Sequence, residues 1–145
     1  MKKMLLLLTA LLSHNVLANE HEQFTQQGKV AIKEFADTLK GSLVAAMKSG
    51  GPIEALTVCN QVAPTIAAEL SKKYGFEIAR TSLKVRNPDN MADDWEQGVL
   101  HQFEYSKEQG QDVKTLFVSE AITQADNHEL RMMKAIPTAA VCLKC

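Results

Sequence analysis

The segment Gly50-Gly51-Pro52 constrains the fold most strongly, because it separates two long helical patterns. Before it, apolar residues recur every three or four positions over residues 22–48, which lines one face of a helix. Glycine favours the end of a helix, and proline fits the first turn of the next one. A second helix is therefore expected over residues 52–74, ending at Gly75.

Pro64 lies inside this second helical pattern, whose apolar stripe includes Leu56, Cys59 and Leu70. Proline lacks an N–H donor and its ring clashes with the preceding turn of a helix. We therefore expect the second helix to kink or break near residues 61–64.

The second half of the chain mixes strand and helix patterns. Residues 76–82 alternate apolar and polar side chains and predict a strand. A turn cluster at 87–90 precedes a helix expected over 91–109. Two further strands, 114–122 and 128–136, flank a turn-rich segment, which predicts an antiparallel hairpin. This order predicts an α+β domain with N-terminal and central helices packed on one antiparallel sheet.

Residues 1–18 have the features of an export signal. Lys2 and Lys3 precede an apolar run over 4–12, and Val16-Leu17-Ala18 offers small residues for cleavage. The run is too short to span a bilayer stably, although an uncleaved N-terminal anchor is the alternative. We expect 1–18 to be removed, which leaves 19–145 as a single periplasmic domain without a membrane span.

Composition excludes one class of partner. The 145 residues include 16 Lys and Arg against 17 Asp and Glu, so the formal net charge is −1. Such a chain is not basic enough to suggest nucleic acid as a partner. It is long enough to bury a core without disulfides, which leaves its three cysteines available for chemistry.

Cys142 and Cys145 form a C-x-x-C motif at the end of the sequence. Two thiols at this spacing suit covalent attachment to the two vinyl groups of haem. In such a site a histidine directly after the second cysteine binds the iron. Either that histidine follows Cys145 in the complete gene or Cys145 is the true C-terminus. The spacing alone leaves covalent haem and a plain disulfide loop equally open. It disfavours a thioredoxin-like pair, which opens a helix, and structural zinc, which needs four ligands.

Several short segments of the sequence carry a family resemblance: Ala45-Ala46-Met47, Gly50-Gly51-Pro52, Val58-Cys59, Ala63-Pro64, Arg80-Thr81-Ser82-Leu83-Lys84, Arg86-Asn87-Pro88, Trp95-Glu96, residues 131–137 and Cys142-x-x-Cys145. Together they resemble, over nearly the whole of 19–145, a family of exported single-haem c-type domains of unknown function. The resemblance implies a PAS-like fold, one covalent haem c, and use alone or as a sensor module ahead of signalling domains. In that family a histidine follows the second cysteine, and this sequence ends before that position.

The resemblance also places Cys59 at a recurring cysteine that faces the haem pocket. There its thiolate would be the second axial ligand and would lower the iron potential relative to methionine. Its apolar stripe suits a small buried core residue equally well.

Other side chains that can bind iron are expected to have different roles. Met132 and Met133 are adjacent on a predicted strand, so they point to opposite faces and are expected to fill the core. His14 lies in the expected signal. We expect the remaining histidines, His21, His101 and His128, at the surface.

Several cations lie around the matching segments, and haem carries two propionates that need charge-assisted partners when partly buried. Arg80 and Lys84 lie four residues apart in the predicted strand and are expected to share a face. The expected propionate partners are Arg80, Lys84, Arg86 and Arg131, whereas Lys134 is expected to be solvated.

These observations predict a haem-binding protein rather than an enzyme, because the sequence contains no recognisable triad, paired-carboxylate site or phosphate loop. It would act as a redox or gas-ligand sensor module or as a small electron carrier, with a redox or signalling protein as its partner. The alternative is a haem-free exported thiol–disulfide protein or binding domain.

Overall fold

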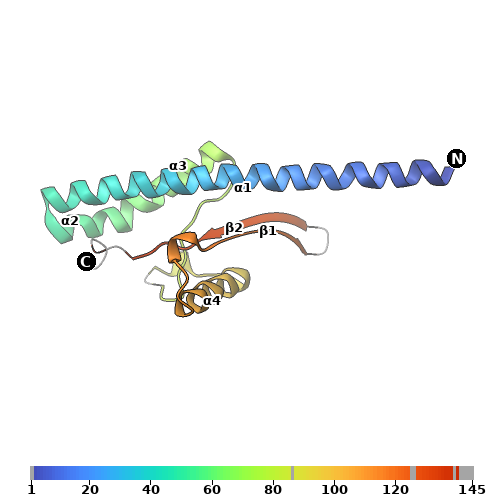
Figure 1. Ribbon diagram of the computed structural model, residues 1–145. Helices are drawn as coiled ribbons and strands as arrows, with labels where there is room; N and C mark the ends of the chain where they lie inside the picture. Colours follow the sequence, from blue (N-terminus) through green and yellow to red (C-terminus); the bar gives the residue numbers. More distant parts are fainter. Residues whose placement is uncertain (1, 86, 125–126, 139, 141–145) are drawn as a thin grey trace.

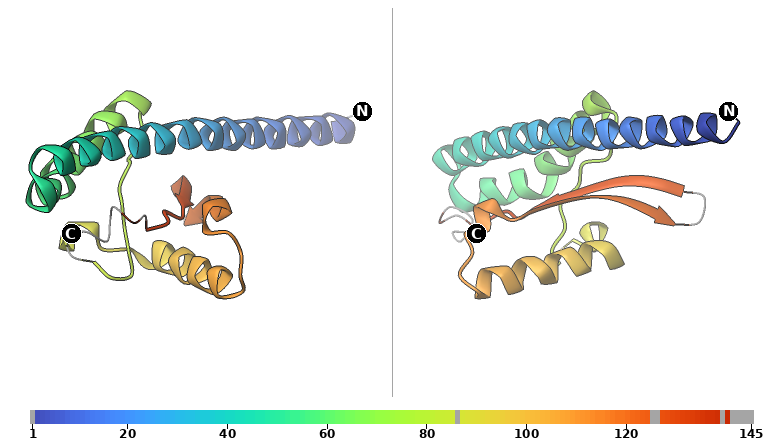
Figure 2. Two further views of the ribbon diagram at one scale, coloured as in Figure 1. Left: turned by 60° about the vertical axis from the view of Figure 1, so that its left-hand side comes forward. Right: turned by 45° about the vertical axis from the view of Figure 1, so that its right-hand side comes forward.

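The computed structural model describes residues 2–85, 87–124, 127–138 and 140, with side chains from residue 19 onward except those of 124 and 127. The elements form three layers: a pair of antiparallel helical segments, a two-stranded ribbon and one further helix (Figure 1, Figure 2). The predicted α+β class is confirmed. The PAS-like character of the sheet stays a prediction.

The helical layer contains α1 (Lys2–Ser49), α2 (Gly51–Thr57), a π-helical turn η1 (Val58–Val62) and α3 (Ala63–Tyr74). The chain reverses between α1 and α2, where Gly51 has a φ of 70° that favours glycine. Near the expected kink or break at 61–64 the structure has the π-helical turn η1, through which the helix continues into α3. Within the described residues, no helix offers a stretch long and apolar enough to cross a membrane.

Two apolar clusters join α1 to the returning helices. Near the reversal, Leu43 and Ala46 pack against Ala55 and Val58. Further along α1, Phe35 packs with Ile66 and Leu70. A polar link lies beyond them, because Lys73 Nζ and Tyr74 Oη donate to the Glu34 carboxylate at 2.7 and 2.6 Å.

The ribbon consists of β1 (Phe117–Gln124) and β2 (Asn127–Lys134), which pair antiparallel as predicted. One face lies on α1, where Met132 packs directly against Gly28. The other face carries Val118 and Met133, which pack with Val99, Phe103 and Leu116 on the side of the third layer. Met132 and Met133 therefore point to opposite faces, as expected, and both are half-buried, Met132 against Gly28 and Met133 at the edge of the cluster around Phe103.

The third layer is α4 (Asp94–Glu108), which begins later than the predicted 91–109. Its start is set by Asp93, which accepts from the Glu96 N–H while the Glu96 side chain accepts from the Asp93 N–H. This capping box requires an extended Asp93 and so excludes Met91 from the helix. The strand predicted from residue 114 also begins later, because η3 (Val113–Thr115) forms a short 3-10 turn capped by Asp112.

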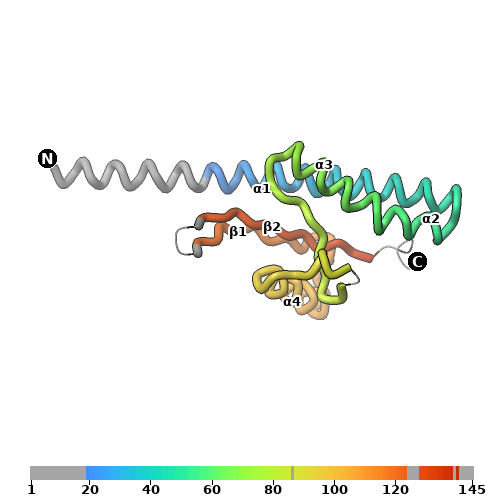
Figure 3. The backbone as a smooth tube through the Cα atoms, turned by 180° about the vertical axis from the view of Figure 1, so that it is seen from behind, coloured from blue at the N-terminus to red at the C-terminus, as the bar shows by residue number. Residues whose placement is uncertain are grey.

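The strand predicted over 76–82 is wrong. Residues 76–82 form no strand. Among the described residues, their β-type pairing consists of one isolated bridge between Ser82 and Met91. It crosses between layers instead of joining the ribbon (Figure 3). Its apolar side chains alternate because they pack on helices: Phe76 meets the Phe24 ring at 5.4 Å, and Ile78 joins the cluster around Phe35.

The contact between Gly28 and Met132 predicts a position-dependent effect of side chains on α1. A Cβ at Gly28 would overlap the end of Met132, whereas a Cβ at Gly41 meets nothing within 4 Å. A side chain at Gly28 requires the flexible end of Met132 to move aside, so we expect Gly28→Leu to lower the free energy of unfolding by about 1 kcal/mol through overpacking. Gly41→Leu is expected to raise it by up to about 1 kcal/mol through helix propensity. Urea denaturation measures both, and equal effects at the two glycines would contradict this packing.

The polar link at Glu34 predicts pH-dependent stability. Hydrogen bonds from Lys73 and then Tyr74 hold the pKa of Glu34 below its usual value. A carboxylate lowered in this way stabilises the fold above its ordinary pKa, and the stabilisation is lost as pH falls through the lowered pKa. Glu34→Gln should therefore destabilise the chain near neutral pH and have little effect in acid. Thermal denaturation across pH tests this, with the exposed Asp37→Asn as a control that changes little.

Candidate functional site

Cys59 lies in the η1 turn, on the flank of the helical pair. Its thiol is free and half-buried, and its side chain packs at the edge of the cluster formed by Leu43, Ala46, Ala55 and Val58. π-helical turns within α-helices are rare and occur frequently at functional sites. The position therefore suits both interpretations of Cys59, since the residue contacts the core and still reaches the surface.

The structure brings Arg80 to Cys59. Arg80 lies in residues 76–82, the crossing segment that connects the layer of α1 and α3 to the layer of α4. Arg80 Nη2 donates to the Cys59 carbonyl oxygen at 3.4 Å, and the guanidinium carbon lies 5.9 Å from the centre of the Phe35 ring. In the described part of the chain, no carboxylate lies within ion-pair distance of Arg80. Lys84 is exposed on the loop beyond, where its N–H donates to Ser82 Oγ at 3.1 Å. Arg86 lies outside the described residues.

Arg131 is placed differently from Arg80. It lies on the α4 side of the ribbon, with its guanidinium 2.6 Å from Asp93 and 3.5 Å from Glu96, and stacked 4.5 Å from the centre of the Trp95 ring. Burial opposes ionisation of Asp93, but the Glu96 N–H and the Arg131 guanidinium outweigh it and lower the pKa of Asp93. The charge of Arg131 is therefore shared with carboxylates at the start of α4.

The histidines are distributed over the molecule. His21 is half-buried, contrary to expectation, because its Nε2 meets Ser119 Oγ of β1 at 2.9 Å. His101 and His128 are exposed, as expected. The side chain of His14 lies outside the described residues. No three His, Cys, Asp or Glu side chains in the described ranges converge to hold a metal ion.

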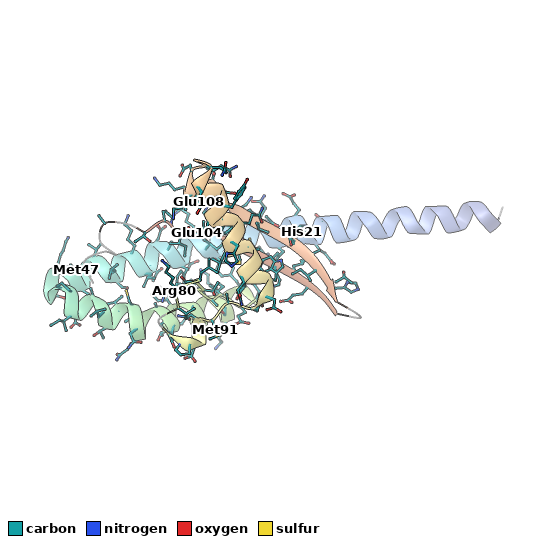
Figure 4. All side chains as sticks on the ribbon, turned by 90° about the horizontal axis from the view of Figure 1, so that it is seen from below. His21, Met47, Arg80, Met91, Glu104 and Glu108 are labelled. Carbon is teal, nitrogen blue, oxygen red and sulfur yellow. The ribbon has the colours of Figure 1, made fainter. Side chains whose placement is uncertain are left out.

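Several large apolar side chains are exposed on α2, next to Cys59, and elsewhere on the molecule. Ile53 and Leu56 on α2 are 80% and 45% exposed, and Ile136 after β2 is 69% exposed. Met91, 69% exposed, borders a hollow of about 300 Å³ that Leu83 and Val85 also line. Arg80 and Met91 lie near one another, because Ser82 forms an isolated bridge with Met91 (Figure 4). Sequence reasoning did not select Met91 as a site residue, because it assigned this position to the start of the helix expected over 91–109.

The chain after β2 leads toward the α2 end of the helical pair (Figure 1, Figure 3). Residues 135–138 therefore run toward the end of the molecule that carries Cys59 and the exposed side chains of α2. Cys142 and Cys145 themselves lie outside the described residues.

Comparison with known proteins gives one match. A family model described as Tll0287-like matches residues 3–145, which is nearly the whole chain. No curated protein and no solved structure matches the chain significantly.

Proposed function

The chain belongs to the Tll0287-like family, and on this basis we propose that it is an exported, periplasmic c-type haem protein. It would serve as a redox or gas-ligand sensor module or as a small electron carrier, with a redox or signalling protein as its partner. The family match carries the proposal, because this family is one of cytochrome c-like domains and the match includes Cys142 and Cys145. Their spacing suits covalent attachment to the two vinyl groups of haem.

The exposed apolar side chains on α2, next to Cys59, fit a porphyrin in polarity. Exposed apolar patches on folded proteins commonly mark binding surfaces. Ile53 and Leu56 would lose their contact with water against a flat apolar ring bound at this end. The direction of residues 135–138 supports attachment there, since the terminal cysteines follow directly in sequence.

The cations differ in their suitability for propionates. Arg80 is half-buried and lies outside the ion pairs of the described residues, so a propionate would meet an unneutralised charge there. Lys84 is exposed on the same loop and is the second candidate. Arg131 is less suitable, because Asp93 and Glu96 already pair with it. We therefore propose Arg80 and Lys84 as the propionate partners.

Bound haem supplies an iron centre that exchanges an electron or takes up a diatomic ligand. Through Cys59, the chain would determine whether the iron exchanges an electron or takes up a diatomic ligand. Cys59 would hold the iron through its thiolate, which would supply electron density and favour electron transfer. Ligand sensing would be favoured instead if the Cys59 side chain stayed in the apolar cluster on which it packs.

The presence of haem is tested by expressing the full chain, continued to the natural end of its gene, with a cytochrome c maturation system. We expect a Soret band, and colour that stays with the protein through acid–acetone extraction. The matched control is Cys142→Ser with Cys145→Ser, which should be colourless. A colourless native chain with a Cys142–Cys145 disulfide would overturn the proposal in favour of the haem-free thiol alternative.

The role of Cys59 is tested separately by Cys59→Ser in the haem-loaded protein. Loss of a thiolate ligand should shift the visible spectrum and raise the reduction potential, because thiolate donates electron density to iron. Thr57→Ser, at an exposed position on the same turn, is the control that leaves both unchanged. An unchanged spectrum in Cys59→Ser would assign Cys59 to the core alone.

A further inference from the structure

We propose that Arg80 is a positioning residue for Cys59, because its guanidinium replaces a backbone donor that the Cys59 carbonyl lacks. The interest of this contact rests on the proposed function of Cys59. The contact itself depends on the protein chain alone, so it can be tested whether or not haem is attached.

The helical turn around Cys59 leaves its carbonyl without a backbone partner. A carbonyl accepts from the fourth following N–H in an α-helix and from the fifth in a π-helix. The fourth N–H after Cys59 is that of Ala63, which donates to the Val58 carbonyl instead. The fifth position is Pro64, which has no N–H. A partly buried carbonyl in this situation needs a donor from elsewhere.

Arg80 provides that donor from 21 residues further along the chain. Its Nη2 lies 3.4 Å from the Cys59 oxygen, and the guanidinium also lies over the buried Phe35 ring at 5.9 Å. The ring of Phe35 limits the orientations of the guanidinium, and a donor held in this way loses little entropy when it binds the carbonyl. Arg80 therefore fixes the peptide that carries the Cys59 side chain.

The crossing segment that carries Arg80 is itself attached to the start of α4. Thr81 Oγ1 donates to the Asn90 carbonyl at 3.0 Å, and Ser82 forms a bridge with Met91. The segment from Asn90 leads into the capping box at Asp93. A displacement of α4 relative to the helical pair would thus pull on Arg80, and through it on the Cys59 turn. This connection gives the third layer a mechanical route to Cys59.

The test is a double-mutant cycle between Arg80 and Pro64 in the full chain. The readout is the rate at which iodoacetamide labels Cys59, measured on the Cys59 peptide by mass spectrometry so that Cys142 and Cys145 stay intact. Thermal denaturation of each variant is recorded alongside, and labelling is compared well below the melting transition. Lys72→Ala, which removes an exposed cation from α3, is the charge control.

Arg80→Ala should increase the labelling rate of Cys59 by roughly two- to tenfold, the range expected for loss of one hydrogen bond. Pro64→Ala restores an N–H at the fifth position, so the same Arg80→Ala change should have a much smaller effect in that background. Arg80→Lys should give an intermediate rate, and Lys72→Ala should leave it unchanged.

Two results would overturn the proposal. Equal labelling in the native chain and in Arg80→Ala would show that Arg80 does not hold the Cys59 turn. Effects of Arg80→Ala that are the same in both backgrounds would show that Arg80 acts independently of the missing donor, for example on a propionate alone. Neither result bears on whether the chain binds haem, which the Soret band decides separately.

Discussion

The burial of both faces of the β1–β2 ribbon is the interaction on which the other layers depend. A two-stranded ribbon is marginal in water and needs packing against another element. Here α1 covers one face through the close approach of Met132 to Gly28, and α4 covers the other through Val118 and Met133. Adjacent residues of β2 pack on opposite layers, Met132 on α1 and Met133 on the side of α4. A one-residue change of register would therefore turn each side chain to the wrong layer, and the packing that holds α1 and α4 on the ribbon would be lost.

Local patterns predicted most of the elements of this fold. The glycine pair before Pro52, the proline at 64 and the turn before β2 act within a few residues, so their effects are readable from the sequence. The error over 76–82 has a long-range cause. Alternating apolar residues fit a strand, but Phe76 and Ile78 alternate here because they contact α1 and α3. No local pattern distinguishes these two environments.

The candidate site was predictable in its residue types and less so in their partners. Cys59 and Arg80 were both selected from the sequence, and the structure brings them together. Arg131 was selected by the same reasoning about charge, yet Asp93, Glu96 and Trp95 surround it. Sequence reasoning identifies a cation but cannot identify the acid that folds against it, because that acid comes from a different layer. The arrangement of ion pairs thus separates two arginines that the sequence treats alike.

The exposed apolar side chains on α2 affect how the folded chain behaves before a ligand binds to it. Ile53 and Leu56 are accessible as soon as the helical pair forms. In the proposed function, bound haem would cover these side chains, and until then copies of the chain would be able to associate through this end, faster at higher concentration. The interval between folding and haem attachment would therefore be the period of greatest risk of aggregation. A shorter interval would yield more folded protein without any change in the stability of the finished fold.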